Sequence, residues 1–147
     1  MKNFTSLSEI QEALSNGSTN CQSLVDYYLD RIKIHHDLNI YLEVFTDDAL
    51  SQAKLVDAKL KSGTAGRLAG MVIGLKDNIC FEGHKVSASS KILKGFESLY
   101  SATVVERLLE EDAIIIGRLN CDEFAMGSSN ENSAYGAVKN PHNPNKV

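Results

Sequence analysis

The stretch Arg67-Leu68-Ala69-Gly70-Met71-Val72-Ile73-Gly74-Leu75-Lys76-Asp77-Asn78 decides how the rest of the chain is interpreted. Small and apolar residues run without a charge from Leu68 to Leu75, and the run ends at Lys76. A short apolar run bounded by turn residues is typical of a buried strand, which we predict over residues 71–75. A lysine at a strand end is usually solvated. It acts as a base only where burial or a neighbouring cation removes its charge, so both readings stay open here.

A second buried strand is predicted at Ala113-Ile114-Ile115-Ile116-Gly117, which is apolar at every position. Strands that are apolar on both faces belong to parallel sheets covered by helices. The segment between the two strands has helical spacing from Ser101 onward, with either Ser101 as its N-cap or Thr103 and Glu106 as a capping box. Strand, crossover helix and strand form a βαβ unit, so the predicted fold class is α/β.

The residues before this unit are predicted to be mainly helical. Helices are expected over 6–16, from about residue 19 to residue 36, and from Asp47 or Asp48 to Leu60, with a strand over 40–45 between the second and third. We therefore expect one domain over 1–147, in which 1–66 is a helical entry layer and 67–147 is the start of the α/β core.

The composition of the 147 residues is that of an ordinary globular protein, with 43% hydrophobic residues and a formal net charge of −4. The sequence contains no cluster of five or more Lys or Arg, so this stretch is not expected to grip nucleic acid by charge. Its three cysteines and four histidines show neither disulfide nor metal-ligand spacing. With no apolar leader and no run long enough for a membrane, a cytoplasmic location is expected.

Polar residues follow both predicted strands, where parallel sheets usually bind ligands. Lys76 follows the first strand, and the small polar loop 127–133 follows the second. Backbone N–H groups and hydroxyls over Met126-Gly127-Ser128-Ser129 could hold a carbonyl or a carboxylate. A neutral lysine could deprotonate a serine, although no Gly-x-Ser-x-Gly motif is present.

Three carboxylates in these polar segments also have more than one possible role. Asp77 could be a partner of the lysine or the cap of the next turn. Glu123 and Glu131 could be a catalytic pair or ordinary surface groups. The sequence favours the structural reading in each case.

Six blocks of the sequence together resemble the amidase signature family. In chain order they are 74–78 (Gly-Leu-Lys-Asp-Asn), 89–93 (Ser-Ser-Lys-Ile-Leu), 102–108 (Ala-Thr-Val-Val-Glu-Arg-Leu), 115–120 (Ile-Ile-Gly-Arg-Leu-Asn), 122–129 (Asp-Glu-Phe-Ala-Met-Gly-Ser-Ser) and 131–133 (Glu-Asn-Ser). The later blocks look most similar to the branch of the family that works in tRNA-dependent amidotransferases. The fold implied is the first part of a mixed sheet covered by helices, truncated after its first βαβ strands.

The resemblance implies a Ser–cis-Ser–Lys triad that hydrolyses amides through an acyl-enzyme. Lys76 matches the family lysine, and Met126, Gly127, Ser128 and Ser129 match a stretch that lines the amide pocket. Both serines of the triad are expected beyond Val147, so the 147-residue chain is expected to be inactive by itself. The cis peptide at the bridging serine is a costly geometry that only a constrained site maintains.

The resemblance also implies partners. Glutamine is the substrate, and its ammonia passes to a partner that amidates mischarged Glu-tRNA(Gln) or Asp-tRNA(Asn), which makes the whole enzyme a carbon–nitrogen ligase. The B and C subunits complete a heterotrimer, and ATP with magnesium is used by one of these partners, so no cofactor or metal is expected in this chain. Two alternatives remain: a free-standing amidase of the same family, or a non-catalytic product that only binds the partner subunits.

Overall fold

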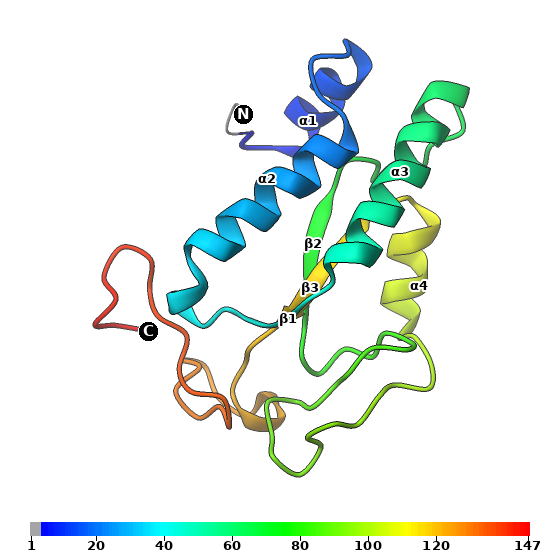
Figure 1. Ribbon diagram of the computed structural model, residues 1–147. Coiled ribbons are helices and arrows are strands. Elements are labelled where there is room, and N and C mark those ends of the chain that lie inside the picture. The colour runs from blue at the N-terminus through cyan, green and yellow to red at the C-terminus, as the bar shows by residue number, and fades with distance from the viewer. Residues whose placement is uncertain (1–3) are drawn as a thin grey trace.

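The computed structural model describes residues 4–147 and has an α/β architecture, as predicted (Figure 1). Its helices are α1 (Leu7–Ser15), α2 (Cys21–Ile34), α3 (Thr46–Ser62) and α4 (Thr103–Glu110), and its strands are β1 (Tyr41–Val44), β2 (Val72–Lys76) and β3 (Ile114–Leu119). Two single turns of 3-10 helix lie at His36–Leu38 and Glu123–Ala125. The sheet order is β1-β3-β2, with β2 parallel and β1 antiparallel to β3, which makes the sheet mixed.

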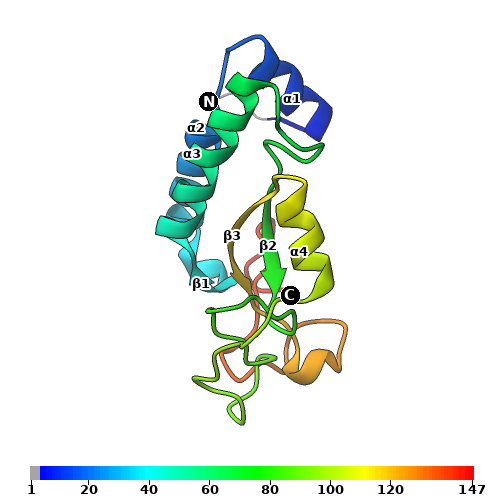
Figure 2. The same ribbon diagram turned by 90° about the vertical axis from the view of Figure 1, so that its right-hand side faces the viewer.

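The central strand β3 separates two apolar clusters, one on each face of the sheet. Helices α2 and α3 cover one face and α4 covers the other, so β2, α4 and β3 form the predicted βαβ unit (Figure 2). Ile114 and Ile116 face the first pair of helices, whereas Ile115 packs with Leu75 and with Val105 of α4. Alternation along a strand places neighbouring side chains on opposite faces, which explains this division.

Strand β3 is buried as expected, but β2 is less enclosed than its apolar sequence predicts. Residues Val72–Gly74 are half-buried, and β2 extends one residue beyond the predicted strand to include an exposed Lys76. The cause is its position, because β2 lies at an edge of the sheet. On the other side of β3, a Cβ on Gly117 would lie 2.5 Å from the carbonyl oxygen of Glu43, so glycine permits the close approach of β1.

The predicted helix starts are confirmed in part. Ser6 caps α1 by accepting a hydrogen bond from the backbone N–H of Glu9, and Asn20 caps α2 in the same way, one residue later than expected. The predicted caps of α4 are wrong: Ala102 occupies the N-cap position, and the Ser101 hydroxyl accepts a hydrogen bond from the backbone N–H of Glu82 instead. None of the helices between residues 4 and 147 is long and apolar enough to span a bilayer.

Candidate active site at the carboxyl ends of the parallel strands

Two loop segments meet beyond the carboxyl ends of β2 and β3, at the lower end of the molecule (Figures 1 and 2). We call residues 77–101 and 120–136 together the loop layer. Backbone hydrogen bonds join the segments, from Phe124 N–H to the carbonyl oxygen of Ala88 (2.8 Å) and from Ala134 N–H to that of Ser89 (2.9 Å). The loops that follow β2 and β3 therefore contact each other at Ala88 and Ser89.

Asp77 lies at the centre of the loop layer, and its side chain is completely buried. Its carboxylate accepts hydrogen bonds from the backbone N–H groups of Ser87 (3.0 Å) and Ser89 (2.6 Å), and from the Ser87 hydroxyl. The Arg118 guanidinium forms an ion pair with the same carboxylate. Asp77 thus serves as neither a simple turn cap nor an isolated partner of the lysine, because it organises the whole 87–89 segment.

Arg118, near the end of β3, links the Asp77 carboxylate to Glu43 of β1. It lies between Asp77 and Glu43, whose carboxylate is 3.2 Å from the second guanidinium nitrogen. Its Nε is buried without a hydrogen-bond partner among residues 4–147. A buried ion pair of this kind is strongly destabilising when one partner is removed, because the other charge is left uncompensated.

Hydrogen bonds in the loop layer maintain backbone conformations that residues other than glycine rarely adopt. Ala88 and Ser89 both have positive φ angles, of 48° and 51°, as do Phe124 and Ala125, at 54° and 59°. A left-handed conformation costs about 1–2 kcal/mol for such a residue and persists only where surrounding bonds enforce it. The four residues sit where the two segments meet, so the strain lies in the junction.

A second carboxylate, Asp122, shapes the loop that carries residues 126–129. It accepts hydrogen bonds from the backbone N–H groups of Asn130 (2.9 Å) and Asn132 (3.0 Å). The bond from Asn132, followed by that from Asn130, holds the pKa of the Asp122 carboxyl below its ordinary value. A Cβ on Gly127 would collide with this carboxylate, so the loop closes tightly only with glycine there.

The residues predicted to act on a substrate lie on the outside of this framework. Lys76 shares a face of β2 with Val72, the face toward α2 and α3, and its side chain is exposed. Met126 is 82% exposed, Gly127 and Ser128 are exposed, and the hydroxyl of Ser129 donates to Glu131 (2.7 Å). The apolar approach to Lys76 therefore does not desolvate it within the described residues, contrary to the burial that a lysine base requires.

Glu123 and Glu131 are both exposed and bind neighbouring serines. The Ser90 hydroxyl donates to Glu123 (2.6 Å), and Ser129 donates to Glu131. Each carboxylate thus has a local structural partner, which agrees with the structural reading of these residues.

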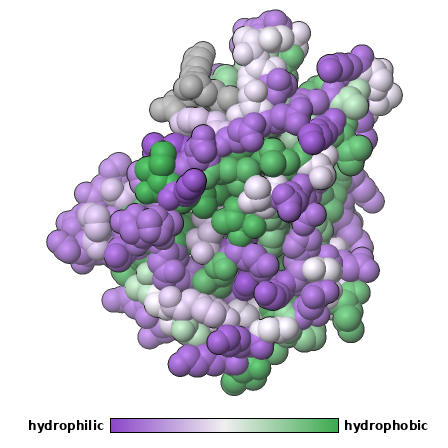
Figure 3. Space-filling model, in the orientation of Figure 1, coloured by the Kyte–Doolittle hydropathy of each residue, from purple (hydrophilic) through white to green (hydrophobic). Residues whose placement is uncertain are grey.

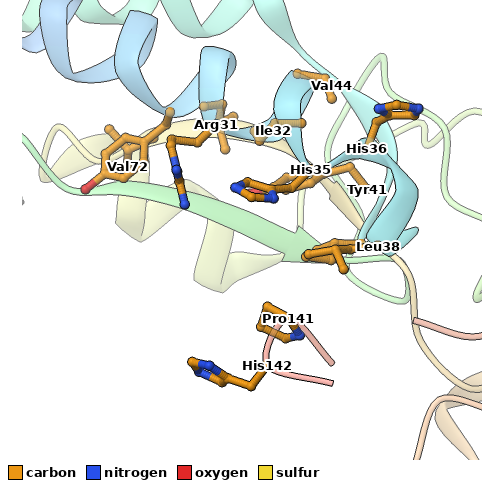
Figure 4. A pocket seen from close by; sticks show the side chains of 13 residues that line it. Arg31, Ile32, His35, His36, Leu38, Tyr41, Val44, Val72, Pro141 and His142 are labelled. Carbon is orange, nitrogen blue, oxygen red and sulfur yellow. The ribbon is translucent and has the colours of Figure 1, made fainter. Parts of the chain in front are cut away.

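A cavity of about 690 Å³ opens on the α2 side of the sheet, beside β2. Figure 4 shows Arg31 and His35 of the α2 end above the strand and His142 below it. The side chains around the cavity mix basic with apolar groups, and apolar surface shows on this side of the molecule in Figure 3. Within residues 4–147, no three His, Cys, Asp or Glu side chains are grouped so that they could hold a metal ion.

Sequence reasoning named Lys76 as a candidate but missed the network beside it, formed by Asp77, Ser87, Arg118 and the Tyr135 hydroxyl, which donates to Ser87 (3.1 Å). One signal was available. Arg118 interrupts an otherwise apolar strand, and a buried arginine needs an acidic partner.

Comparison with known proteins adds a family to this geometry. Residues 23–147 match the family model described as Amidase. The chain is 48% identical to the A subunit of the glutamyl-tRNA(Gln) amidotransferase from Chlorobium phaeobacteroides, and 46% identical to the protein of the same name from Salinibacter ruber. Each match spans 98% of this chain, but only 30% and 28% of the respective relative.

Solved structures agree with the fold. The peptide amidase of Stenotrophomonas maltophilia superposes with a TM-score of 0.85 at 30% identity, over 95% of this chain and 30% of that one. A chain from a vestigial protein complex related to an s-triazine catabolic enzyme superposes with a TM-score of 0.89, also at 30% identity, and this chain covers 31% of it. The chain therefore spans about a third of the length of the relatives it matches.

Proposed function

Because the chain belongs to the amidase family, we propose that it forms the N-terminal part of a glutamine-hydrolysing subunit that supplies ammonia for tRNA-dependent amidation. Glutamine is the substrate, and the acceptor is mischarged Glu-tRNA(Gln) or Asp-tRNA(Asn). The observation that carries this proposal is the identity of 46–48% to the A subunits of glutamyl-tRNA(Gln) amidotransferases, against 30% to a peptide amidase.

In this proposal Lys76 is the base of a Ser–cis-Ser–Lys triad whose serines come from the part of the relatives that this chain does not match. A serine oxygen attacks the amide carbonyl of glutamine, and its proton passes through the bridging serine to the Lys76 amine. The protonated lysine returns this proton, through the bridging serine, to the amide nitrogen, so that ammonia leaves as the acyl-enzyme forms. Water then releases glutamate from the acyl-enzyme. The amide substrate is bound by Met126, Gly127, Ser128 and Ser129. Backbone N–H groups of this stretch donate hydrogen bonds to the carbonyl oxygen of the amide.

The exposure of Lys76 supports an active site to which both parts of such an enzyme contribute. A lysine base requires burial of its amine, so the remaining part of the fold has to cover this amine before it can accept a proton. On this account residues 1–147 alone hydrolyse no glutamine.

The partners in this proposal are the B and C subunits of a heterotrimer in the cytoplasm. One of these partners uses ATP with magnesium and holds the mischarged tRNA. The net charge of −4 supports this assignment, because tight contact with a tRNA backbone depends on clustered Lys and Arg.

A hybrid enzyme tests the proposal. Residues 1–147 replace the matching segment of the Chlorobium phaeobacteroides protein, to which they are 48% identical, and the hybrid is produced with that organism's partner subunits. We expect it to release ammonia from glutamine, measured by a coupled glutamate assay. A folded hybrid without glutaminase activity would contradict the proposal.

The same hybrid separates the alternatives. Hydrolysis of simple amides without partner subunits would favour a free-standing amidase. Assembly with the partners but no hydrolysis of any amide would favour a non-catalytic binding role.

A further inference from the structure

We propose that Asp77 is a positioning residue: it locks the end of β2 to β3 and to the loop layer, and so determines where the Lys76 amine lies. This inference rests on the proposed function, because it concerns the placement of the proposed base.

The first support is that every polar atom of Asp77 has a partner. Its backbone N–H donates to the carbonyl oxygen of Leu119 on β3 (3.0 Å), and its own carbonyl oxygen accepts from Ala88 N–H (2.8 Å). Its carboxylate binds Ser87, Ser89 and Arg118 as described above. The residue that follows Lys76 therefore cannot shift without breaking bonds to both β3 and the loop.

The second support is the contrast between Asp77 and Lys76 themselves. Asp77 is 0% exposed, whereas the neighbouring Lys76 is exposed and has a long flexible side chain. A flexible side chain reaches a reacting atom reproducibly only when its backbone is fixed. A displacement of about 1 Å at a reacting group can cost on the order of a hundredfold in rate.

The third support is that a carboxylate is required at this position. An asparagine has nearly the same shape, but its NH₂ group cannot accept the hydrogen bonds that Ser87 and Ser89 donate. Asparagine would also leave Arg118, which is 8% exposed, with only the half-exposed Glu43 as counter-charge among residues 4–147.

The kinetic test compares Asp77→Asn with Asp112→Asn in the hybrid enzyme. Asp112 is a matched control because it is also buried (5% exposed), pairs with a cation, Lys59, and accepts a backbone N–H, that of Gly66 (2.7 Å). It lies after α4, at the opposite end of β3 from Asp77.

For Asp77→Asn we expect kcat to fall about a hundredfold with KM unchanged, because binding survives and the base is displaced. Both variants should lower the unfolding midpoint by similar amounts, but Asp112→Asn should keep the kcat of the unsubstituted hybrid. Equal losses of kcat in both variants, or no loss in either, would overturn the inference.

A second measurement does not depend on activity and uses the 147-residue chain. The Cys121 backbone N–H donates to the Ser89 hydroxyl (3.0 Å), and its sulfur lies 3.3 Å from that hydroxyl, so alkylation of Cys121 reports whether the 87–89 segment stays in place. Asp77→Asn should accelerate alkylation of Cys121 by iodoacetamide and leave Cys21, buried against α3, unaffected. Asp112→Asn should not accelerate alkylation of Cys121.

The two measurements fail in different ways. A hybrid without any glutaminase activity would remove the proposed function, while the alkylation result would still decide whether Asp77 holds the loop. If Cys121 stays protected in Asp77→Asn, the inference is wrong even in an active hybrid.

Discussion

Two interiors of this molecule, one beneath α2 and α3 and one in the loop layer, are held by different forces. We call α2, α3 and the β3 side chains that they cover the helical layer. There, small apolar side chains such as Val25, Ala49 and Ala53 are fully buried against Ile114. In the loop layer the fully buried side chains are Asp77, Ser89 and Ser90.

The difference shows which interactions fix the positions of individual residues. Apolar burial is non-directional, and it stabilises the helical layer in proportion to area. Hydrogen bonds to a carboxylate are directional and fix individual backbone groups. The helical layer therefore supplies stability, whereas the loop layer supplies the positions on which a catalytic site depends.

The largest effect on stability should come from the helical layer. Ile114→Ala removes a fully buried side chain, and we expect a loss of about 3 kcal/mol in the free energy of unfolding, measured by urea titration. Leu99→Ala is the control: its side chain is 83% exposed, so its change should stay below about 0.5 kcal/mol. Similar losses in the two variants would show that β3 is not packed as described.

A smaller, local effect should follow acidification of the loop layer. The pKa of Asp122 is lowered in the folded chain, so its contribution is fully present above the ordinary value of 3.8 and is lost as the pH falls through the lowered value. The amide signals of Asn130 and Asn132, followed by NMR, should therefore stay unchanged down to about pH 4 and move below it.

Asp122→Asn is the control for this acid transition, because it removes the titrating group. The variant should show no movement of these amide signals between neutral pH and acid. A transition well above pH 4 in the unsubstituted chain would mean that the two backbone N–H groups do not bind the carboxylate.

The smallest effect concerns thiol reactivity, which probes both layers without changing any residue. Burial, followed by the nearby Asp57 carboxylate, raises the pKa of the Cys21 thiol to about 12, and Cys121 in the loop layer is 4% exposed. Half-buried Cys80 should therefore react first with iodoacetamide at pH 8, as read by peptide mass spectrometry. If Cys121 reacted as fast as Cys80, the loop layer would be mobile rather than fixed.

The helical layer could be predicted from the sequence because apolar residues recur there at regular spacing. A helix was expected from about residue 19 to residue 36, where α2 lies, and the apolar run over 113–117 indicated β3. The exposed edge position of β2 was not predictable, since strand order depends on which segments pair and not on the composition of one strand.

The loop layer could be predicted only in part. The rule about carboxyl ends of parallel strands pointed to the loops that follow β2 and β3, and these loops contact each other at Ala88 and Ser89. The bonds among Asp77, Ser87 and Arg118 have no periodic signature, because they join residues up to 41 positions apart. The left-handed pair Ala88 and Ser89 also escaped prediction, since neither residue type favours that conformation.

The central claim, that Lys76 is the base of an amidase site, is tested most directly by trapping the acyl-enzyme. The hybrid enzyme and its Lys76→Ala variant are each mixed with glutamine and quenched in acid, and the intact masses are measured, with Lys91→Ala as an exposed-lysine control. We expect an added glutamyl group on the hybrid and on Lys91→Ala, and none on Lys76→Ala. A glutamyl adduct on Lys76→Ala, formed at the rate seen in the hybrid, would contradict the account.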